Sequence, residues 1–107
     1  MELRDMLQIL AKQDGSDLYL STGAPPCAKF NGALRPLNEM PLEPGEVARI
    51  AADLMDSEQK QQFEKELEMN LAISLPQIGR FRVNIFKQRN EVSLVARNIK
   101  TEIPRFE

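Results

Sequence analysis

The feature that most constrains the fold is an alternation of apolar and polar side chains in residues 80–88. The odd positions begin Phe81, Val83 and Ile85, whereas most even positions are polar. Successive side chains of a β-strand point to opposite faces, so a period of two predicts a strand with one buried face and one exposed face. This segment is therefore expected to lie in a sheet that is packed on one side.

The residues that follow predict the partner of this strand. A tight turn centred on Arg89 and Asn90 would fold residues 92–99 back as an antiparallel strand. In that register Phe81, Val83 and Ile85 face Asn98, Ala96 and Leu94, which keeps the buried side mostly apolar. The same register places Arg82 directly opposite Arg97.

The rest of the chain predicts an α+β domain with about three helices and five or six short antiparallel strands. Apolar residues at helical spacing occur twice, at Leu3, Met6, Leu7 and Leu10 and at Val47, Ile50, Ala51 and Leu54. A polar third helix follows a cap at Asp56 and Ser57, and Gly15 is expected to stop the first helix. Strands are expected at 17–21, at 27–30 and 33–37 around Asn31-Gly32, and from Met69 onward.

Composition excludes several classes of protein. The 107 residues suit one domain, and a net charge of −2 argues against a nucleic-acid partner. The chain has no histidine and one cysteine, Cys27, which argues against an internal disulfide, imidazole metal sites and His-based catalysis. We predict no metal site: Asp14 and Asp17 flank Gly15-Ser16, but two carboxylates without further ligands are better explained by a helix end and a strand start.

Positive charge is concentrated near the C-terminal end. Residues 1–76 carry 7 basic and 13 acidic side chains, whereas residues 77–107 carry 7 and 3. Two arginines facing each other across a sheet repel, and an anion between them would relieve that repulsion. Guanidinium groups bind phosphate in a bidentate manner, so Arg82 and Arg97 are a candidate phosphate site, with Arg80 and Gln88 nearby. The simpler alternative is a solvated sheet face whose arginines pair with glutamates.

No motif in the chain supports an independent catalytic centre. It contains no G-x-x-x-x-G-K-[ST] phosphate loop, no G-x-G-x-x-G and no serine with a histidine partner. We therefore expect no catalytic residue and no enzymatic activity in this chain alone.

Several tracts resemble the N-terminal domain of the type IV pilus retraction ATPases, the PilT/PilU branch of the secretion ATPase superfamily. The similar tracts are Gly15-Ser16-Asp17-Leu18-Tyr19-Leu20-Ser21-Thr22-Gly23-Ala24-Pro25-Pro26, Asn31-Gly32, Gly79-Arg80-Phe81-Arg82-Val83-Asn84, Phe86-Lys87-Gln88-Arg89-Asn90 and Val95-Ala96-Arg97-Asn98-Ile99. The resemblance covers essentially the whole chain. Gln88-Arg89-Asn90, and Tyr19 where the PilT branch more often has histidine, favour the PilU-like branch.

The resemblance implies a division into domains and a role for the arginines. Residues 1–100 would form a PAS-like N-terminal domain and residues 101–107 the start of a linker to a RecA-like, P-loop ATPase domain beyond Glu107. The arginines would contact the phosphates of ATP held, with Mg²⁺, by that second domain. Arg82 and Arg97 match the implied positions, and Arg80 and Gln88 would be further members of the site. No cofactor is expected on the N-terminal domain by itself.

The resemblance also implies partners and a location. The full-length protein would be a cytoplasmic homo-hexameric ATPase associated with the inner-membrane pilus machinery. It would power pilus retraction and twitching motility, together with the inner-membrane platform and a paralogous retraction ATPase. Two alternatives stay open: a PAS-like module that binds a small ligand, and a domain that packs between subunits through arginine ion pairs.

Overall fold

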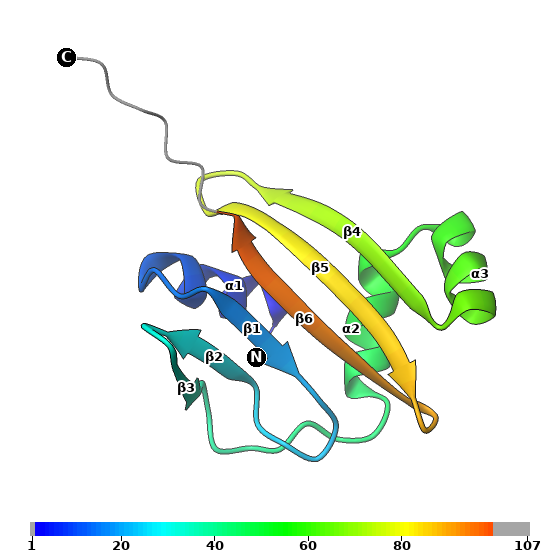
Figure 1. The fold of residues 1–107 in the computed structure, drawn as a ribbon, viewed down its shortest axis with the longest axis horizontal. Helices are drawn as coiled ribbons and strands as arrows, with labels where there is room; N and C mark the ends of the chain where they lie inside the picture. The colour runs from blue at the N-terminus through cyan, green and yellow to red at the C-terminus, as the bar shows by residue number, and fades with distance from the viewer. Residues whose placement is uncertain (1, 100–107) are drawn as a thin grey trace.

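The computed structural model describes residues 2–99 and confirms the α+β fold class (Figure 1). Met1 and residues 100–107, including the predicted linker at 101–107, lie outside the described part. The elements in chain order are α1 (Leu3–Lys12), β1 (Asp17–Leu20), β2 (Cys27–Phe30), β3 (Ala33–Pro36), α2 (Glu46–Leu54), α3 (Ser57–Glu66), β4 (Glu68–Leu75), β5 (Gly79–Gln88) and β6 (Glu91–Ile99).

The strands form one antiparallel sheet in the order β3-β2-β1-β6-β5-β4. Two local units, β1-β2-β3 and β4-β5-β6, are joined by the pairing of β1 with β6, the first strand with the last. Strands from the two ends of the described chain therefore lie side by side at the centre of the sheet (Figure 1).

One face of the sheet is packed and contributes to the core. Helices α1 and α2 lie behind the sheet in Figure 1, whereas α3 lies beyond the β4 edge. On the covered face, several side chains of β5 and β6 have no exposed surface, among them Phe81, Val83, Ile85 and Leu94. The helices contribute their own apolar stripes, Met6, Leu7 and Leu10 from α1 and Val47, Ile50 and Ala51 from α2. Burial of these stripes is the main stabilising term for such short helices.

The predicted hairpin register is confirmed. Phe81 pairs with Asn98, Val83 with Ala96 and Ile85 with Leu94. Arg89 and Asn90 both have positive φ, 54° and 65°, as a two-residue type I′ turn requires. The polar Asn98 is accommodated on the covered face because its side-chain Nδ2 donates to the Gly15 carbonyl oxygen at 3.1 Å.

Gly15 lies at the end of α1, as expected, but glycine is required there for another reason. Helix α1 ends at Lys12, and the residue in the left-handed region is Asp14, with φ 57°. Gly15 is buried, and a Cβ there would lie 2.5 Å from Leu10 Cδ1 and 2.8 Å from Phe30 Cε1. The Gly15 N–H closes the end of α1, because it donates to the Leu10 carbonyl oxygen at 2.7 Å. The need for glycine at this position comes from the close packing between α1 and β2.

The predicted cap of the polar third helix is confirmed. The Asp56 side chain accepts a hydrogen bond from the Gln59 backbone N–H, and the Gln59 side chain accepts one from the Asp56 N–H. This reciprocal capping box satisfies two backbone donors that the first helical turn leaves without partners. It starts α3 despite a helix surface that is almost entirely polar.

Candidate functional site

The two arginines singled out from the sequence lie side by side on the face of the sheet opposite the helices. Arg82 on β5 is directly opposite Arg97 on β6, and both are exposed. Arg97 is in turn opposite Asp17 on β1, and Asp17 is opposite Lys29 on β2. Directly opposed residues share a face, so one row across four strands carries Lys29, Asp17, Arg97 and Arg82 in that order.

Asp17 and Arg97 form an ion pair within this row. Arg97 Nε donates to Asp17 Oδ1 at 3.3 Å. The side chain of Asp17 is 11% exposed, whereas that of Arg97 is 73% exposed. The carboxylate therefore lies against the sheet, and the guanidinium extends into solvent above it.

Arg82 has no such partner. Within residues 2–99 its guanidinium makes no ion pair and no side-chain hydrogen bond. The alternative expected from the sequence was a solvated sheet face with its arginines paired to glutamates of the helices. Arg82 and Arg97 are both exposed to solvent, but neither pairs with a glutamate among the described residues. The row keeps a net positive charge, because it contains three cations and one anion.

The other two predicted residues lie on the same face at different distances. Arg80 is opposite Ile99, two residues along β5 from Arg82, about 7 Å away. Gln88 is opposite Glu91 next to the turn, about 20 Å along the strand from Arg82. Arg80 therefore lies close to the arginine pair. Gln88 is too far along the strand to contact the same phosphate, and it could contact only a different part of one ligand.

The arginine-bearing face also carries apolar side chains that are not fully covered. Tyr19, Val95 and Phe86 belong to this face and are only half-buried. No described helix lies over them, since α1 and α2 are both on the other side (Figure 1). We call this surface, with its row of charges and these apolar residues, the open face.

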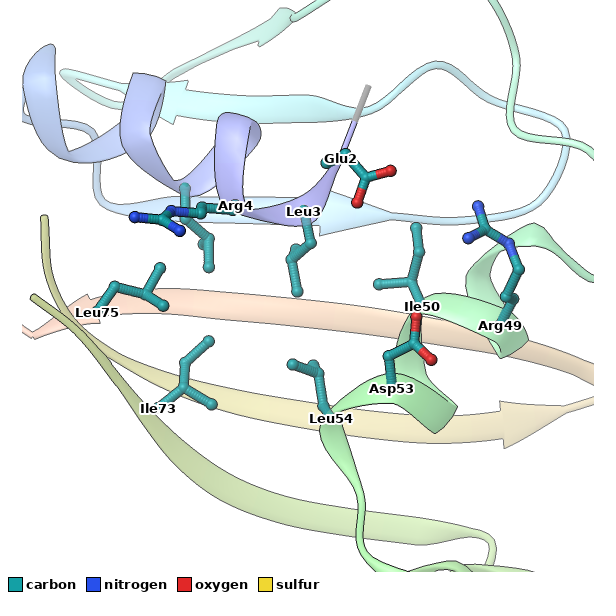
Figure 2. Close-up of a pocket in the computed structure, with 10 residues that line it drawn as sticks. Glu2, Leu3, Arg4, Arg49, Ile50, Asp53, Leu54, Ile73 and Leu75 are labelled. Carbon is teal, nitrogen blue, oxygen red and sulfur yellow. The ribbon is translucent and has the colours of Figure 1, made fainter.

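A groove on the opposite, helical side offers a different kind of site. It lies between α1, α2 and β4, and its floor is apolar, with Leu3, Ile50, Leu54, Ile73 and Leu75 directed toward its centre (Figure 2). Arg4, Arg49, Glu2 and Asp53 surround it.

The groove is small for a ligand pocket. Its volume of about 180 Å³ is below the range of roughly 300–1,000 Å³ typical of sites for drug-sized ligands. It is also open to the surface, and it lies on the far side of the sheet from the arginine pair. The open face is therefore the better candidate for the functional site.

The charges of the open face would suit anion recognition. Two guanidinium groups on adjacent strands can present several N–H donors to one phosphate, and their positive charge would stabilise negative charge that develops there. Within residues 2–99 no group of three or more acidic, cysteine or histidine side chains is placed to hold a metal ion. The pair of exposed guanidinium groups on β5 and β6 would suit binding and electrostatic stabilisation.

Asp17 is the member of this site that the sequence analysis did not assign. We interpreted it as the start of a strand, which it is, but its contact with Arg97 depends on the pairing of β1 with β6. The one signal in the sequence was a charged residue opening an otherwise apolar strand. That signal does not identify a partner 80 residues away.

No protein-family model matches the chain, but whole-chain comparisons do. The type IV pilus ATPase PilU of Pseudomonas aeruginosa is 40% identical over 107 residues, which is all of this chain and 28% of that protein. The type IV pilus retraction ATPase PilT of the same bacterium is 37% identical over 103 residues, 96% of this chain and 30% of that protein. The chain thus spans less than a third of the length of these curated relatives.

The fold comparison agrees with the sequence comparison. A crystal structure of the pilus retraction motor PilT with bound ADP superposes with a TM-score of 0.86 at 28% identity, over 97% of this chain and 31% of that one. The α+β domain described here is therefore of the kind found in secretion ATPases. More particularly, the chain belongs to the PilT/PilU family and corresponds to its N-terminal domain. None of the helices within residues 2–99 is long and apolar enough to cross a membrane.

Proposed function

We propose that residues 1–100 are the N-terminal domain of a homo-hexameric ATPase that powers type IV pilus retraction and twitching motility. The linker would begin at residues 101–107, and a RecA-like domain with the phosphate loop would follow. The observation that carries the proposal is the placement of Arg82 opposite Arg97 on the open face, in a domain whose relatives are pilus ATPases. The identity of 40% to PilU, against 37% to PilT, supports the PilU-like branch, together with Tyr19 and Gln88-Arg89-Asn90.

In this proposal the domain supplies positive charge and the RecA-like domain holds ATP and Mg²⁺. Arg82 and Arg97 would contact the nucleotide phosphates, Arg80 would lie at the margin of the contact, and Gln88 would reach another part of the nucleotide. Guanidinium groups stabilise the charge spread over the phosphoryl oxygens during hydrolysis, as arginine fingers do.

The same contact would couple hydrolysis to movement. Loss of the γ-phosphate removes an anionic ligand of the arginines, so the domain would be released and rotate about the linker around 101–104. Passed to neighbouring subunits, this rotation would drive pilus disassembly. The hexameric ATPase would act in the cytoplasm at the inner-membrane pilus platform, together with a paralogous retraction ATPase.

The test uses the longer protein that joins this chain to its ATPase domain. Arg82→Ala and Arg97→Ala are each expected to lower ATP turnover on the order of 100-fold while the hexamer persists in light scattering. Arg35→Ala is the matched control, because Arg35 is an exposed arginine on the edge strand β3, outside the row. Normal turnover in both row variants would refute the phosphate contact, and a coding sequence without a downstream phosphate loop would refute the domain assignment.

A second candidate function is supported by the half-buried apolar side chains of the open face. Tyr19, Phe86 and Val95 would suit a domain that packs between subunits, with the arginines in interface ion pairs. This alternative predicts that Arg82→Ala weakens assembly but leaves turnover per assembled ring unchanged. Light scattering and turnover measured on the same sample distinguish the two functions.

A further inference from the structure

We propose that Asp17 is a positioning residue for the nucleotide contact. Its carboxylate would hold the Arg97 guanidinium through Nε, so that the two terminal nitrogens face a phosphate. This inference rests on the proposed function, and it assigns to Asp17 a role that acts only through Arg97.

The ion pair joins a covered carboxylate, the anchor Asp17, to an exposed guanidinium, that of Arg97. The hydrogen bond of 3.3 Å joins Asp17 Oδ1 to Arg97 Nε, the nitrogen closest to the side-chain stem. The anchor is almost completely covered, whereas the guanidinium is 73% exposed. Within residues 2–99 the terminal nitrogens of Arg97 make no hydrogen bond. They keep their four N–H donors for a ligand, and a planar guanidinium uses those donors in a fixed fork.

The burial of Asp17 is unusual for a surface ion pair. It is the one charged side chain that is buried among residues 2–99, and a buried carboxylate loses hydration that a single exposed arginine restores only in part. An ordinary surface pair contributes little to stability and does not require a buried partner. A rigid base for an exposed arginine accounts for this combination.

The charges of the row also indicate that Asp17 orients Arg97 and does not neutralise the row. Asp17 lies between Lys29 and Arg97, with Arg82 next in the row, so one negative charge is shared among three cations. The row remains attractive to an anion while one of its two arginines is held. A guanidinium that is already oriented loses less conformational freedom on binding phosphate, which strengthens the contact. Arg82, which is not held, would complete the contact when phosphate arrives.

The first measurement tests the contact in the 107-residue chain. Arginine Nε–Hε signals in nitrogen-15 NMR should show Arg97 with slowed hydrogen exchange relative to Arg82. Asp17→Ala should remove the difference, and Asp17→Asn should keep part of it, because an amide oxygen still accepts from Nε–H. Equal exchange at both arginines in the unmodified chain would overturn the proposal.

The second measurement tests the role, in the longer protein that contains the ATPase domain. Asp17→Ala is expected to lower kcat for ATP roughly 10-fold to 100-fold, and Asp17→Asn to restore most of it. In an Arg97→Ala background, Asp17→Ala should have no further effect. Glu64→Ala, which removes an exposed carboxylate on α3 outside the row, is the matched control and should leave kcat within a factor of about three.

The outcomes separate this inference from the proposed function. If Arg97→Ala lowers turnover but both Asp17 variants behave as the parent protein, the positioning role is wrong and the phosphate contact stands. If Asp17→Asn is as impaired as Asp17→Ala, or if Asp17→Ala lowers turnover further without Arg97, then Asp17 acts through charge or folding and the inference fails. If Arg97→Ala leaves turnover unchanged, the phosphate contact and the positioning role both fail, and slowed exchange at Arg97 would then show only a structural ion pair with Asp17.

Discussion

The two faces of the sheet are built from the same strands but differ in burial and in charge. On β5, Phe81 has no exposed surface, whereas its neighbour Arg82 is exposed and makes no ion pair within residues 2–99. The covered face is defined by shape, because each side chain there must fit against α1, α2 or a neighbouring strand. The open face is defined by charge and by the absence of a described element above it. Stability should therefore depend on the first face and binding on the second.

The largest effect that would test this division is a cavity on the covered face. Phe81→Ala should lower the free energy of unfolding by about 3–5 kcal/mol, because a fully buried aromatic side chain is removed and the surroundings relax only in part. Urea denaturation followed by circular dichroism measures this. A loss below about 1 kcal/mol would mean that the covered face is not the core.

A smaller effect is expected where α1 approaches the sheet. Gly15→Ala adds one methyl group at a position where a Cβ would lie 2.5 Å from Leu10 Cδ1, so overpacking should cost about 1–3 kcal/mol. Thermal unfolding measures the change. Gly23→Ala is the control that measures backbone strain without crowding. Gly23 has a φ of 89°, and a Cβ there would meet no atom within 4 Å.

The hairpin turn sets the register of both faces, and it carries a residue under strain. Arg89 has a φ of 54°, which glycine adopts without steric cost, so Arg89→Gly should raise stability by about 0.5–1 kcal/mol. Lys87→Gly, within β5 and outside the positive-φ residues, should lower stability instead. Chemical denaturation of both variants gives the comparison, and a loss of stability in Arg89→Gly would contradict the left-handed turn.

The smallest effect is expected on the open face. Arg82→Ala should change the free energy of unfolding by less than about 0.5 kcal/mol, with a slight gain because it removes repulsion with Arg97. The gain should shrink as salt is added, since salt screens exposed charges. Urea denaturation at low and high salt checks this. A large loss would show that Arg82 supports the fold, and the division between the two faces would no longer hold.

The sequence predicted local structure well because its strongest signals are local. The alternation around Phe81 and the turn at Arg89 and Asn90 were enough to place Arg82 opposite Arg97, and the structure has this register. The cap at Asp56 was equally visible from neighbouring residues.

What the sequence did not reveal depends on contacts between distant segments. Gly15 was expected to stop a helix, and its N–H does bond to the last turn of α1, but the requirement for glycine comes from Phe30 and Leu10, which close around it. The partner of Asp17 could not be inferred, because no local pattern shows that the first strand pairs with the last. The phosphate role of the arginines stays a prediction, drawn from the hairpin register and from the family resemblance.

The pairing of the first strand with the last has a consequence for how the domain folds. Contacts between residues far apart in sequence require closure of a long loop, which costs chain entropy and slows folding. Asp17 and Arg97 are separated by 80 residues, so their contact can form only after β6 has emerged during synthesis and joined β1. The earlier strands, β1 to β5, could form hairpins first, but Arg97 would be missing from the charged row. A partly made or partly unfolded chain would thus lack the contact between Asp17 and Arg97, so this contact would mark a sheet whose first and last described strands have paired.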